Sequence, residues 1–165
     1  GPDLVLRWSA LLHDIGKLAI PDAILLKPGR FTPPEWEVMK THASIGGRVL
    51  EGDDSSLMVM ARDIAYTHHE KWDGTGYPQG LAGEAIPMAG RIAALSDVFD
   101  ALTSSRPYKS AWTVEDALNY VREQRGRHFD PQLVDAFLDL LPQLLAVRDR
   151  FAETLVGRAT EPLQH

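Results

Sequence analysis

The sequence predicts an all-α protein with about six or seven helices. Apolar residues recur at three- and four-residue steps over most of the chain, which is the period of one helix face. No segment stands out with the two-residue alternation of a half-buried strand. At 165 residues the chain has the length of one domain, so we expect residues 1–165 to fold as a single helical domain.

Three helices are predicted in the first half of the chain. The first carries apolar residues on one helical face, namely Leu4, Trp8, Leu11, Leu12 and Ile15. It should end before Pro21. Thr32, with Glu35 three residues later, has the pattern of a capping box, and the helix it opens should reach about residue 50. A polar turn then caps a third helix, which should continue to about Thr67.

The second half begins with a long irregular segment. Residues 70–87 are interrupted repeatedly by Gly and Pro, so we predict a loop, and loops of this length in compact domains are often functional. A helix should follow at about 88–104. Thr113 should cap another helix that ends near Arg125, and Asp130 should cap a last long apolar segment.

Composition excludes several classes of protein. A net charge of −6 and a pI near 5.4 argue against a general binder of nucleic-acid polymers. The absence of cysteine excludes disulfides, thiolate metal sites and cysteine nucleophiles. No apolar run approaches the ~18–20 residues that span a bilayer, and no signal-peptide pattern is present. We therefore expect a cytoplasmic protein.

A set of histidines and aspartates on or beside the predicted helices is the strongest chemical signal: His13, Asp14, His42, His68, His69 and Asp97. One helical histidine is more often a core or surface residue than a ligand, and the His13-Asp14 dipeptide alone is weak evidence. The combination on four helices favours a metal site. Asp97 lies in a helix that is apolar nearly all round, where a buried carboxylate is costly unless it is paired or metal-bound. Imidazole and carboxylate ligands without thiolate suit iron, manganese or zinc.

The spacing of these residues suggests two ions. Adjacent side chains on a helix diverge by about 100°, so neither His13 with Asp14 nor His68 with His69 should chelate one ion together. The pairs would instead address two neighbouring ions, with an aspartate as the bridge. Two divalent ions and two aspartates leave the site cationic, which suits a phosphate substrate. Two metals about 3.5–4 Å apart can share a hydroxide and hold phosphoryl oxygens for in-line displacement.

Lys17 lies one helical turn beyond His13 and Asp14. A lysine is ordinarily a solvated surface charge. Beside metals, a positive donor would stabilise a phosphate oxygen or the leaving alkoxide.

Three segments in order carry a resemblance to a known family. They are residues 13–17 (His-Asp-Ile-Gly-Lys) with Pro21, residues 40–42 (Lys-Thr-His) with Gly46, and residues 68–78, which contain His-His-Glu and end in Gly-Tyr-Pro. The chain resembles the HD-GYP family, a bacterial branch of the HD-domain metal phosphohydrolases, over about residues 8–140. The resemblance implies a phosphodiesterase that hydrolyses cyclic di-GMP to pGpG and then often to GMP.

The resemblance also implies roles for individual residues. The implied metal ligands are His13, Asp14, His42, His68, His69 and Asp97. Asp14 would bridge the metals and Lys17 would lie near the scissile phosphate, so we expect these two residues to be catalytic. The implied substrate-binding residues are Gly76, Tyr77, Arg106 and Lys109. Gly76-Tyr77-Pro78 alone would be read as a turn with a packed aromatic residue. The implied cofactors are two divalent ions, with iron or manganese favoured over zinc.

One departure from the family concerns the start of the chain. Family members usually have an earlier helix with another histidine and sometimes a glutamate that is tied to a third metal, and no residue here matches those positions. We therefore expect two metals rather than three, and a fragment of a larger protein that has an upstream sensory or receiver domain. Leu4, Trp8 and Leu11 would then form an apolar patch that favours a homodimer.

Two other functions fit the sequence. The first is an HD phosphohydrolase that acts on another nucleotide or another cyclic dinucleotide. The second is a non-catalytic module that binds a dinucleotide or a partner protein. The intact His13-Asp14 pair favours an enzyme, and the missing upstream helix favours an inactive domain.

Overall fold

The structure is a computed structural model that describes residues 12–104 and 110–143. Within these residues it contains six α-helices and two short 3-10 helices, and no β-strand. The all-α class and the expected number of helices are therefore confirmed. None of the described helices is both long enough and apolar enough to cross a membrane.

Four elements make up the first half of the described chain: η1 (Ile15–Ala19), α2 (Asp22–Leu25), α3 (Pro33–Val49) and α4 (Ser56–Thr67). The bounds of α3 and α4 agree with the sequence prediction. The capping box that opens α3 is also present, since the main-chain N–H of Thr32 donates to Oε2 of Glu35 at 2.7 Å. The side chain of Ser55 caps α4.

The first predicted helix differs from the structure. Leu4, Trp8 and Leu11 lie outside the described residues, but residues 12–14 form a turn and η1 is a 3-10 helix, so no α-helix passes through Ile15. A Cβ atom on Gly16 would clash with the carbonyl oxygen of His42, which shows how closely η1 packs on α3. The short helix α2 was not predicted.

The second half begins with the predicted loop of residues 70–87, which contains only η2 (Gly83–Ala85) and an isolated bridge between Asp73 and Ala82. The loop leads into α5 (Met88–Thr103). Helix α6 (Val114–Glu123) starts at Thr113, whose side chain accepts from the N–H of Asp116 as expected. The last described helix covers residues 131–143.

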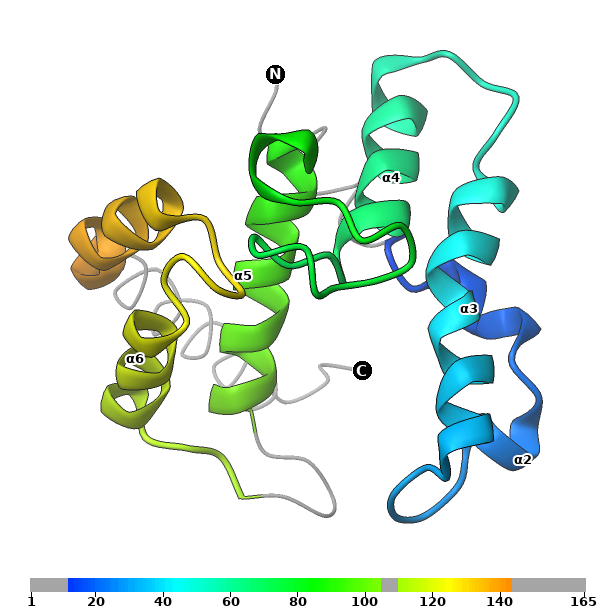
Figure 1. The fold of residues 1–165 in the computed structure, drawn as a ribbon, viewed down its shortest axis with the longest axis horizontal. Coiled ribbons are helices and arrows are strands. Elements are labelled where there is room, and N and C mark those ends of the chain that lie inside the picture. Colours follow the sequence, from blue (N-terminus) through cyan, green and yellow to red (C-terminus); the bar gives the residue numbers. More distant parts are fainter. Residues whose placement is uncertain (1–11, 105–109, 144–165) are drawn as a thin grey trace, which may run out of the picture.

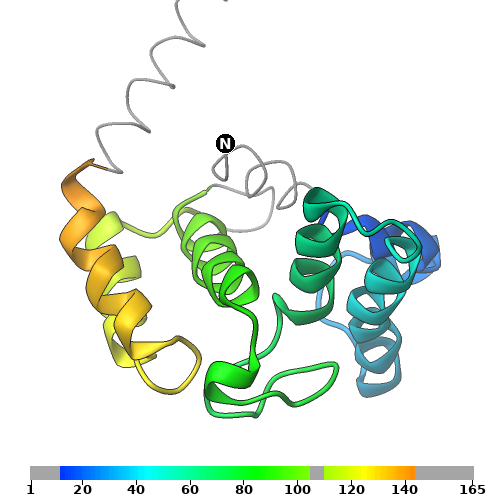
Figure 2. The ribbon, with the colours of Figure 1, turned by 90° about the horizontal axis from the view of Figure 1, so that it is seen from above.

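The helices form one row, which is clearest in the view from above (Figure 2). η1 packs on α3 at one end, followed by α4, α5 and α6. The helix of residues 131–143 lies beside α6 at the other end, while the loop of residues 70–87 lies in front of α4 and α5 in Figure 1.

Two apolar cores lie at opposite ends of this row. One is built on Leu50, Ala61 and Ala65 of the α3–α4 half, with Ile15 of η1 packed against it. The other is built on Leu95 of α5 with Val121, Phe129 and Val134. Five of the six predicted ligand residues lie where η1, α3 and α4 meet.

Candidate metal centre

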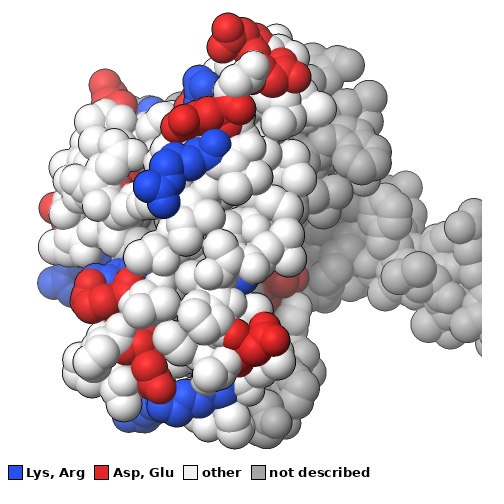
Figure 3. Space-filling view, turned by 90° about the vertical axis from the view of Figure 1, so that its right-hand side faces the viewer, with Lys and Arg blue, Asp and Glu red and all other residues white. Residues whose placement is uncertain are grey.

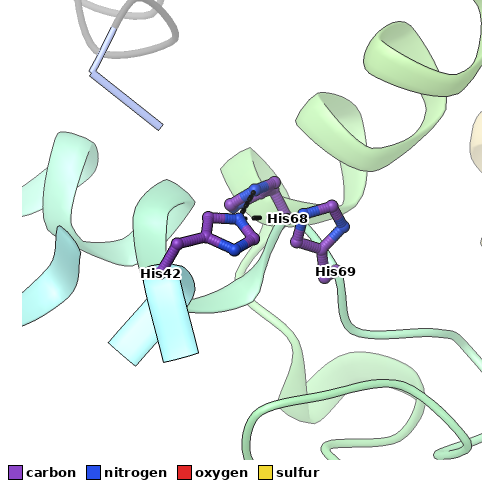
Figure 4. Close-up of side chains that lie close together, drawn as sticks. All are labelled: His42, His68 and His69. Carbon is purple, nitrogen blue, oxygen red and sulfur yellow. Dashed lines mark hydrogen bonds between the residues drawn. The ribbon is translucent and has the colours of Figure 1, made fainter. Parts of the chain in front are cut away.

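Three elements bring five of the six predicted ligands together. His13 and Asp14 lie in the turn that precedes η1, and His42 lies in the middle of α3. His68 and His69 follow the last residue of α4. Figure 4 shows the imidazole rings of His42, His68 and His69 converging from α3 and from the end of α4.

The ligand atoms of these residues are within a few ångströms of one another. Nε2 of His42 lies 3.1 Å from Nε2 of His69 and 3.4 Å from Nε2 of His68. Oδ1 of Asp14 lies 3.6 Å from Nε2 of His42 and 3.9 Å from Nε2 of His68. Among the described residues, two groups have ligand atoms within 4.8 Å of one another: His42, His68 and His69, and His13, Asp14 and His68. His68 belongs to both.

The three imidazoles are held in their neutral forms. Burial lowers the pKa of His42, and burial with the neighbouring His13 lowers the pKa of His68 to about 4. Burial, followed by the charges of His68 and His42, also lowers the pKa of His69. Neutral imidazole is the form that binds a metal.

Main-chain carbonyls decide which nitrogen of two rings carries the proton. Nδ1 of His42 lies 2.7 Å from the carbonyl oxygen of Met39, and Nδ1 of His68 lies 3.0 Å from that of Ile64. Since a carbonyl oxygen only accepts, both rings must donate from Nδ1, and both Nε2 atoms carry lone pairs. The Nε2 atoms of His68 and His69 both lie near Nε2 of His42. Of these three nitrogens, only that of His69 can carry a proton while the rings are neutral. A hydrogen bond from the other ring nitrogen to a carbonyl oxygen is typical of metal-ligating histidines.

Asp14 adds a carboxylate to the three imidazoles. Burial opposes ionisation of this carboxyl, but hydrogen bonds from His13 and Lys17 together with their charges outweigh it and lower its pKa. Oδ2 lies 2.6 Å from Nζ of Lys17 and 3.3 Å from Nε2 of His13. Oδ1 is buried and has no hydrogen-bond partner among the described residues. A buried carboxylate oxygen beside unprotonated imidazoles is what a cation would satisfy, so these residues fit a metal.

The ligand atoms of each adjacent pair lie close together, and the division of each pair between two ions stays a prediction. His13 and Asp14 belong to one group of ligand atoms, and His68 and His69 belong to the other. The 100° divergence applies within a regular helix, whereas His13 and Asp14 precede η1 and His69 follows the helix end. The irregular backbone lets both members of each pair turn toward the same point.

Asp97 of α5 is not in either group. It is half-buried rather than buried, and it lines a cavity of about 220 Å³ together with His13, Ala93, Ser96 and Asp100. Because His13 also lines this cavity, Asp97 lies near the candidate centre. Its role as a ligand stays a prediction.

The predicted substrate loop contacts the cluster through Tyr77. The Tyr77 ring stacks on His69 with a centroid distance of 4.8 Å and an interplanar angle of 25°. Burial raises the pKa of Tyr77, followed by the negative charges of Asp14 and Asp97, so the phenol stays protonated. Gly76 lies against the backbone of Glu70 and Lys71, where a Cβ atom would clash. Arg106 and Lys109 lie outside the described residues.

Glu70 anchors this loop and was not singled out from the sequence. The side chain is only 1% exposed, and its two carboxylate oxygens accept from the main-chain N–H groups of Gln79 at 2.7 Å and Leu81 at 3.1 Å. The sequence does contain a signal, because a charged residue directly follows the two histidines. Its partners could not be read from the sequence, since they lie nine and eleven positions away.

Comparison with known proteins identifies the family. The profile of the family described as HD domain matches residues 3–133, which is most of the chain. The chain therefore belongs to the HD domain family, and the resemblance inferred from the sequence motifs is confirmed.

Two curated relatives are similar over most of the chain. The cyclic di-GMP phosphodiesterase response regulator RpfG of Xanthomonas campestris pv. campestris is 51% identical over 148 residues, which are 90% of this chain and 39% of the relative. The 3′3′-cGAMP-specific phosphodiesterase 2 of Vibrio cholerae is 49% identical over 144 residues, which are 87% of this chain and 28% of the relative. The chain thus spans well under half the length of these relatives.

A solved structure shows the same fold. The crystal structure of a cyclic GMP-AMP-specific phosphodiesterase of V. cholerae, V-cGAP3, superposes with a TM-score of 0.59 at 23% sequence identity. The match covers 84% of this chain and 38% of that chain.

Proposed function

We propose that this domain is a metal-dependent phosphodiesterase that hydrolyses cyclic di-GMP to pGpG, with further hydrolysis to GMP. One observation carries the proposal more than any other. The unprotonated Nε2 atoms of His42 and His68 lie 3.4 Å apart, beside a buried Asp14 oxygen that has no hydrogen-bond partner among the described residues. Lone pairs that face one another in a buried site call for a cation.

The residues that would hold two divalent ions are the two groups of ligand atoms already described, with Asp97 as a further ligand. His68 is common to both groups. The two oxygens of Asp14 face different partners, Oδ1 toward His42 and His68 and Oδ2 toward His13 and Lys17, which suits a bridging carboxylate. Imidazole and carboxylate ligands favour iron or manganese in this setting. When bound, two such ions supply Lewis-acid activation of the phosphoryl group and of water.

The chain's own residues supply binding and charge. Lys17 holds Asp14 ionised through its 2.6 Å contact, and its side chain is 40% exposed, so Nζ can reach a phosphate oxygen in the site. A cation at that position stabilises negative charge on the phosphoryl and leaving oxygens. Tyr77 keeps its phenolic proton and therefore acts as a hydrogen-bond donor to the ligand rather than as a base. Gly76, Arg106 and Lys109 are proposed as further ligand contacts.

A second cyclic dinucleotide is a specific alternative. A relative that is 49% identical is named a 3′3′-cGAMP-specific phosphodiesterase. The two ligands share the phosphodiester ring and differ in one base, so the same centre could act on either.

The expected context of the domain also remains a proposal. The relatives are much longer than this chain, and one of them is named a response regulator, which supports an upstream receiver or sensory domain. The homodimer stays a prediction because Leu4, Trp8 and Leu11 lie outside the described residues. The cytoplasmic location likewise stays a prediction.

A substrate panel with metal analysis tests the proposed activity. The purified chain is loaded with Mn²⁺ or, anaerobically, with Fe²⁺, and its metal content is measured by elemental analysis. Cyclic di-GMP, 3′3′-cGAMP and linear pGpG are then followed by chromatography. We expect about two metals per chain and conversion of cyclic di-GMP to pGpG. A metal-loaded protein that binds the dinucleotide without hydrolysing it would instead support a receptor.

A further inference from the structure

A row of aromatic rings leads from the candidate centre to the surface. His69 stacks on Tyr77, and the Tyr77 ring meets Trp36 of α3 edge to face at a centroid distance of 5.9 Å. Trp36 in turn stacks on Phe31 at 6.2 Å with an interplanar angle of 18°. Only Tyr77 therefore separates Trp36 from a predicted metal ligand.

Trp36 is exposed although it is the largest side chain on its helix. It is 42% exposed, while the residues that α3 buries include Met39 and His42. The α3 core does not enclose the indole fully, so a large part of this aromatic surface stays in contact with solvent. A ring held between two aromatic neighbours and left open to solvent is instead suited to stacking another flat ring.

The charges around Trp36 agree with a purine ligand. Lys40 lies one helical turn later and places Nζ 5.9 Å from the centroid of the Tyr77 ring. Its ion pair with Glu37 measures 2.9 Å and that of Lys27 with Glu35 measures 2.6 Å, so acidic and basic side chains adjoin on the face that carries α2 and α3 (Figure 3). Because positive and negative charges are mixed on this face, a ligand would be held there by stacking and local hydrogen bonds more than by long-range electrostatic attraction.

We propose that Trp36 is a base-binding residue, on which one purine base of the cyclic dinucleotide stacks while its phosphate lies at the metal centre. Lys40 lies where its ammonium group can donate to the acceptor atoms that guanine carries at N7 and O6. Stacking on an aromatic side chain is a general means of holding a base because every base has a π-face. This inference rests on the proposed function and names the part of the substrate that the metal centre itself does not recognise.

The tyrosine that supports Trp36 is fixed before the ligand binds, so Trp36 and Tyr77 together form a base platform. Glu70 fixes residues 79 and 81, the N–H of Tyr77 donates to the carbonyl oxygen of His69 at 3.2 Å, and Gly76 sits tightly on the Glu70 backbone. Tyr77 is thereby fixed against His69, and Trp36 contacts Tyr77 from the rigid scaffold of α3. A preorganised surface reduces the ordering cost of binding.

Two substrates separate base recognition from catalysis. Cyclic di-GMP carries purines, whereas bis(p-nitrophenyl) phosphate offers a phosphodiester without them. For Trp36→Ala we expect the KM for cyclic di-GMP to rise about 5- to 150-fold, the range that base–aromatic stacking supplies, with kcat little changed. The kcat/KM for bis(p-nitrophenyl) phosphate should stay within about twofold, and Trp36→Phe should recover most of the lost affinity.

The chain provides a matched control at Trp112. This residue is 39% exposed and also contacts another aromatic ring, Tyr120, but it lies next to α6. Trp112→Ala should leave the KM for cyclic di-GMP unchanged. Thermal unfolding of both variants shows whether each one folds as the wild type does.

Tryptophan fluorescence tests base stacking on Trp36 independently of the proposed hydrolysis. Cyclic di-GMP should quench the tryptophan fluorescence of the wild-type protein and of Trp112→Phe. It should quench the fluorescence of Trp36→Phe much less. A protein that shows this Trp36-dependent quenching without turnover would retain the base platform and lose the proposed hydrolysis. A protein that hydrolyses cyclic di-GMP with the same KM in wild type and Trp36→Ala would overturn the platform, and so would Trp36→Ala slowing both substrates equally.

Discussion

The Nε2 atoms of His42 and His68 lie 3.4 Å apart, and both rings direct their Nδ1 protons to main-chain carbonyl oxygens. The two Nε2 atoms are therefore as close as the partners of a hydrogen bond, but neither carries a proton to donate. Elements far apart in the sequence, α3 and the end of α4, hold this arrangement. It explains how a helical bundle with an acidic overall charge can prepare a cation site.

Loss of the His42 ring should remove metal. For His42→Ala we expect the metal content to fall and turnover to decrease by more than the ~10–100-fold that is usual when a hydrogen-bond partner of a metal ligand is lost. Because a metal that binds only the folded state stabilises it, chelation should lower the Tm of the wild type and change that of the variant much less. Elemental analysis and thermal unfolding measure both effects. His128→Gln is the control that should keep its metal; full metal content in His42→Ala would refute the ligand assignment.

Gly16 should be intolerant of a side chain. A Cβ atom at Gly16 would clash with the His42 carbonyl, so Gly16→Ala should push η1 and Asp14 away from α3 and lower both Tm and metal affinity. Gly46 lies at the same crossing, where a Cβ atom would come 3.2 Å from the Gly16 nitrogen. Gly46→Ala should be milder, because a helical alanine gains about 0.5–1 kcal/mol over glycine. Equal losses of Tm in the two variants would contradict this account.

Both carboxylate oxygens of Glu70 should be needed to hold the loop of residues 70–87. Glu70→Gln keeps the shape but turns an amide NH₂ toward one of the two main-chain N–H donors, so we expect a loss of about 1–3 kcal/mol in unfolding free energy. Hydrogen exchange at Gln79 and Leu81 should accelerate, and the KM for cyclic di-GMP should rise as Tyr77 loses its fixed position. Glu84→Gln is the control, since Glu84 is exposed in the same loop. Unchanged exchange at both amides would show that Glu70 does not hold the loop.

His128 should make stability depend on pH. Burial, followed by the charge of Lys71, lowers its pKa to about 4, whereas the unfolded state has an ordinary value near 6.5. Between about pH 6.5 and 4 the unfolded chain therefore binds up to one proton more than the folded chain at this residue. The unfolding free energy should fall by up to about 1.4 kcal/mol per pH unit as the pH decreases through this window.

The contribution of His128 can be isolated by comparing wild type with His128→Gln in urea titrations of metal-free protein. His42, His68 and His69 also have lowered pKa values and contribute in both proteins, so they cancel in the difference. The wild type should lose more stability than the variant between pH 6.5 and 4. Parallel curves over this range would show that His128 titrates normally in the folded state.

Local interactions made much of the fold predictable. The start of α3 depends on Thr32 and Glu35, which are three residues apart, and the start of α4 depends on the adjacent Ser55. The periodicity of apolar residues likewise involves neighbours within two turns. The sequence of ligand-type residues from His13 to His69 also indicated a metal centre and the HD-GYP resemblance, since these depend on residue identity and order.

Only the tertiary structure decided how those residues are grouped and what supports them. His13 and Asp14 face one group because they precede a 3-10 helix, while regular helical geometry would have turned them apart. The anchoring of Glu70 and the exposure of Trp36 depend on contacts with segments far along the chain. Side-chain direction at helix ends and burial are set by packing between distant elements, and no local pattern encodes that packing by itself.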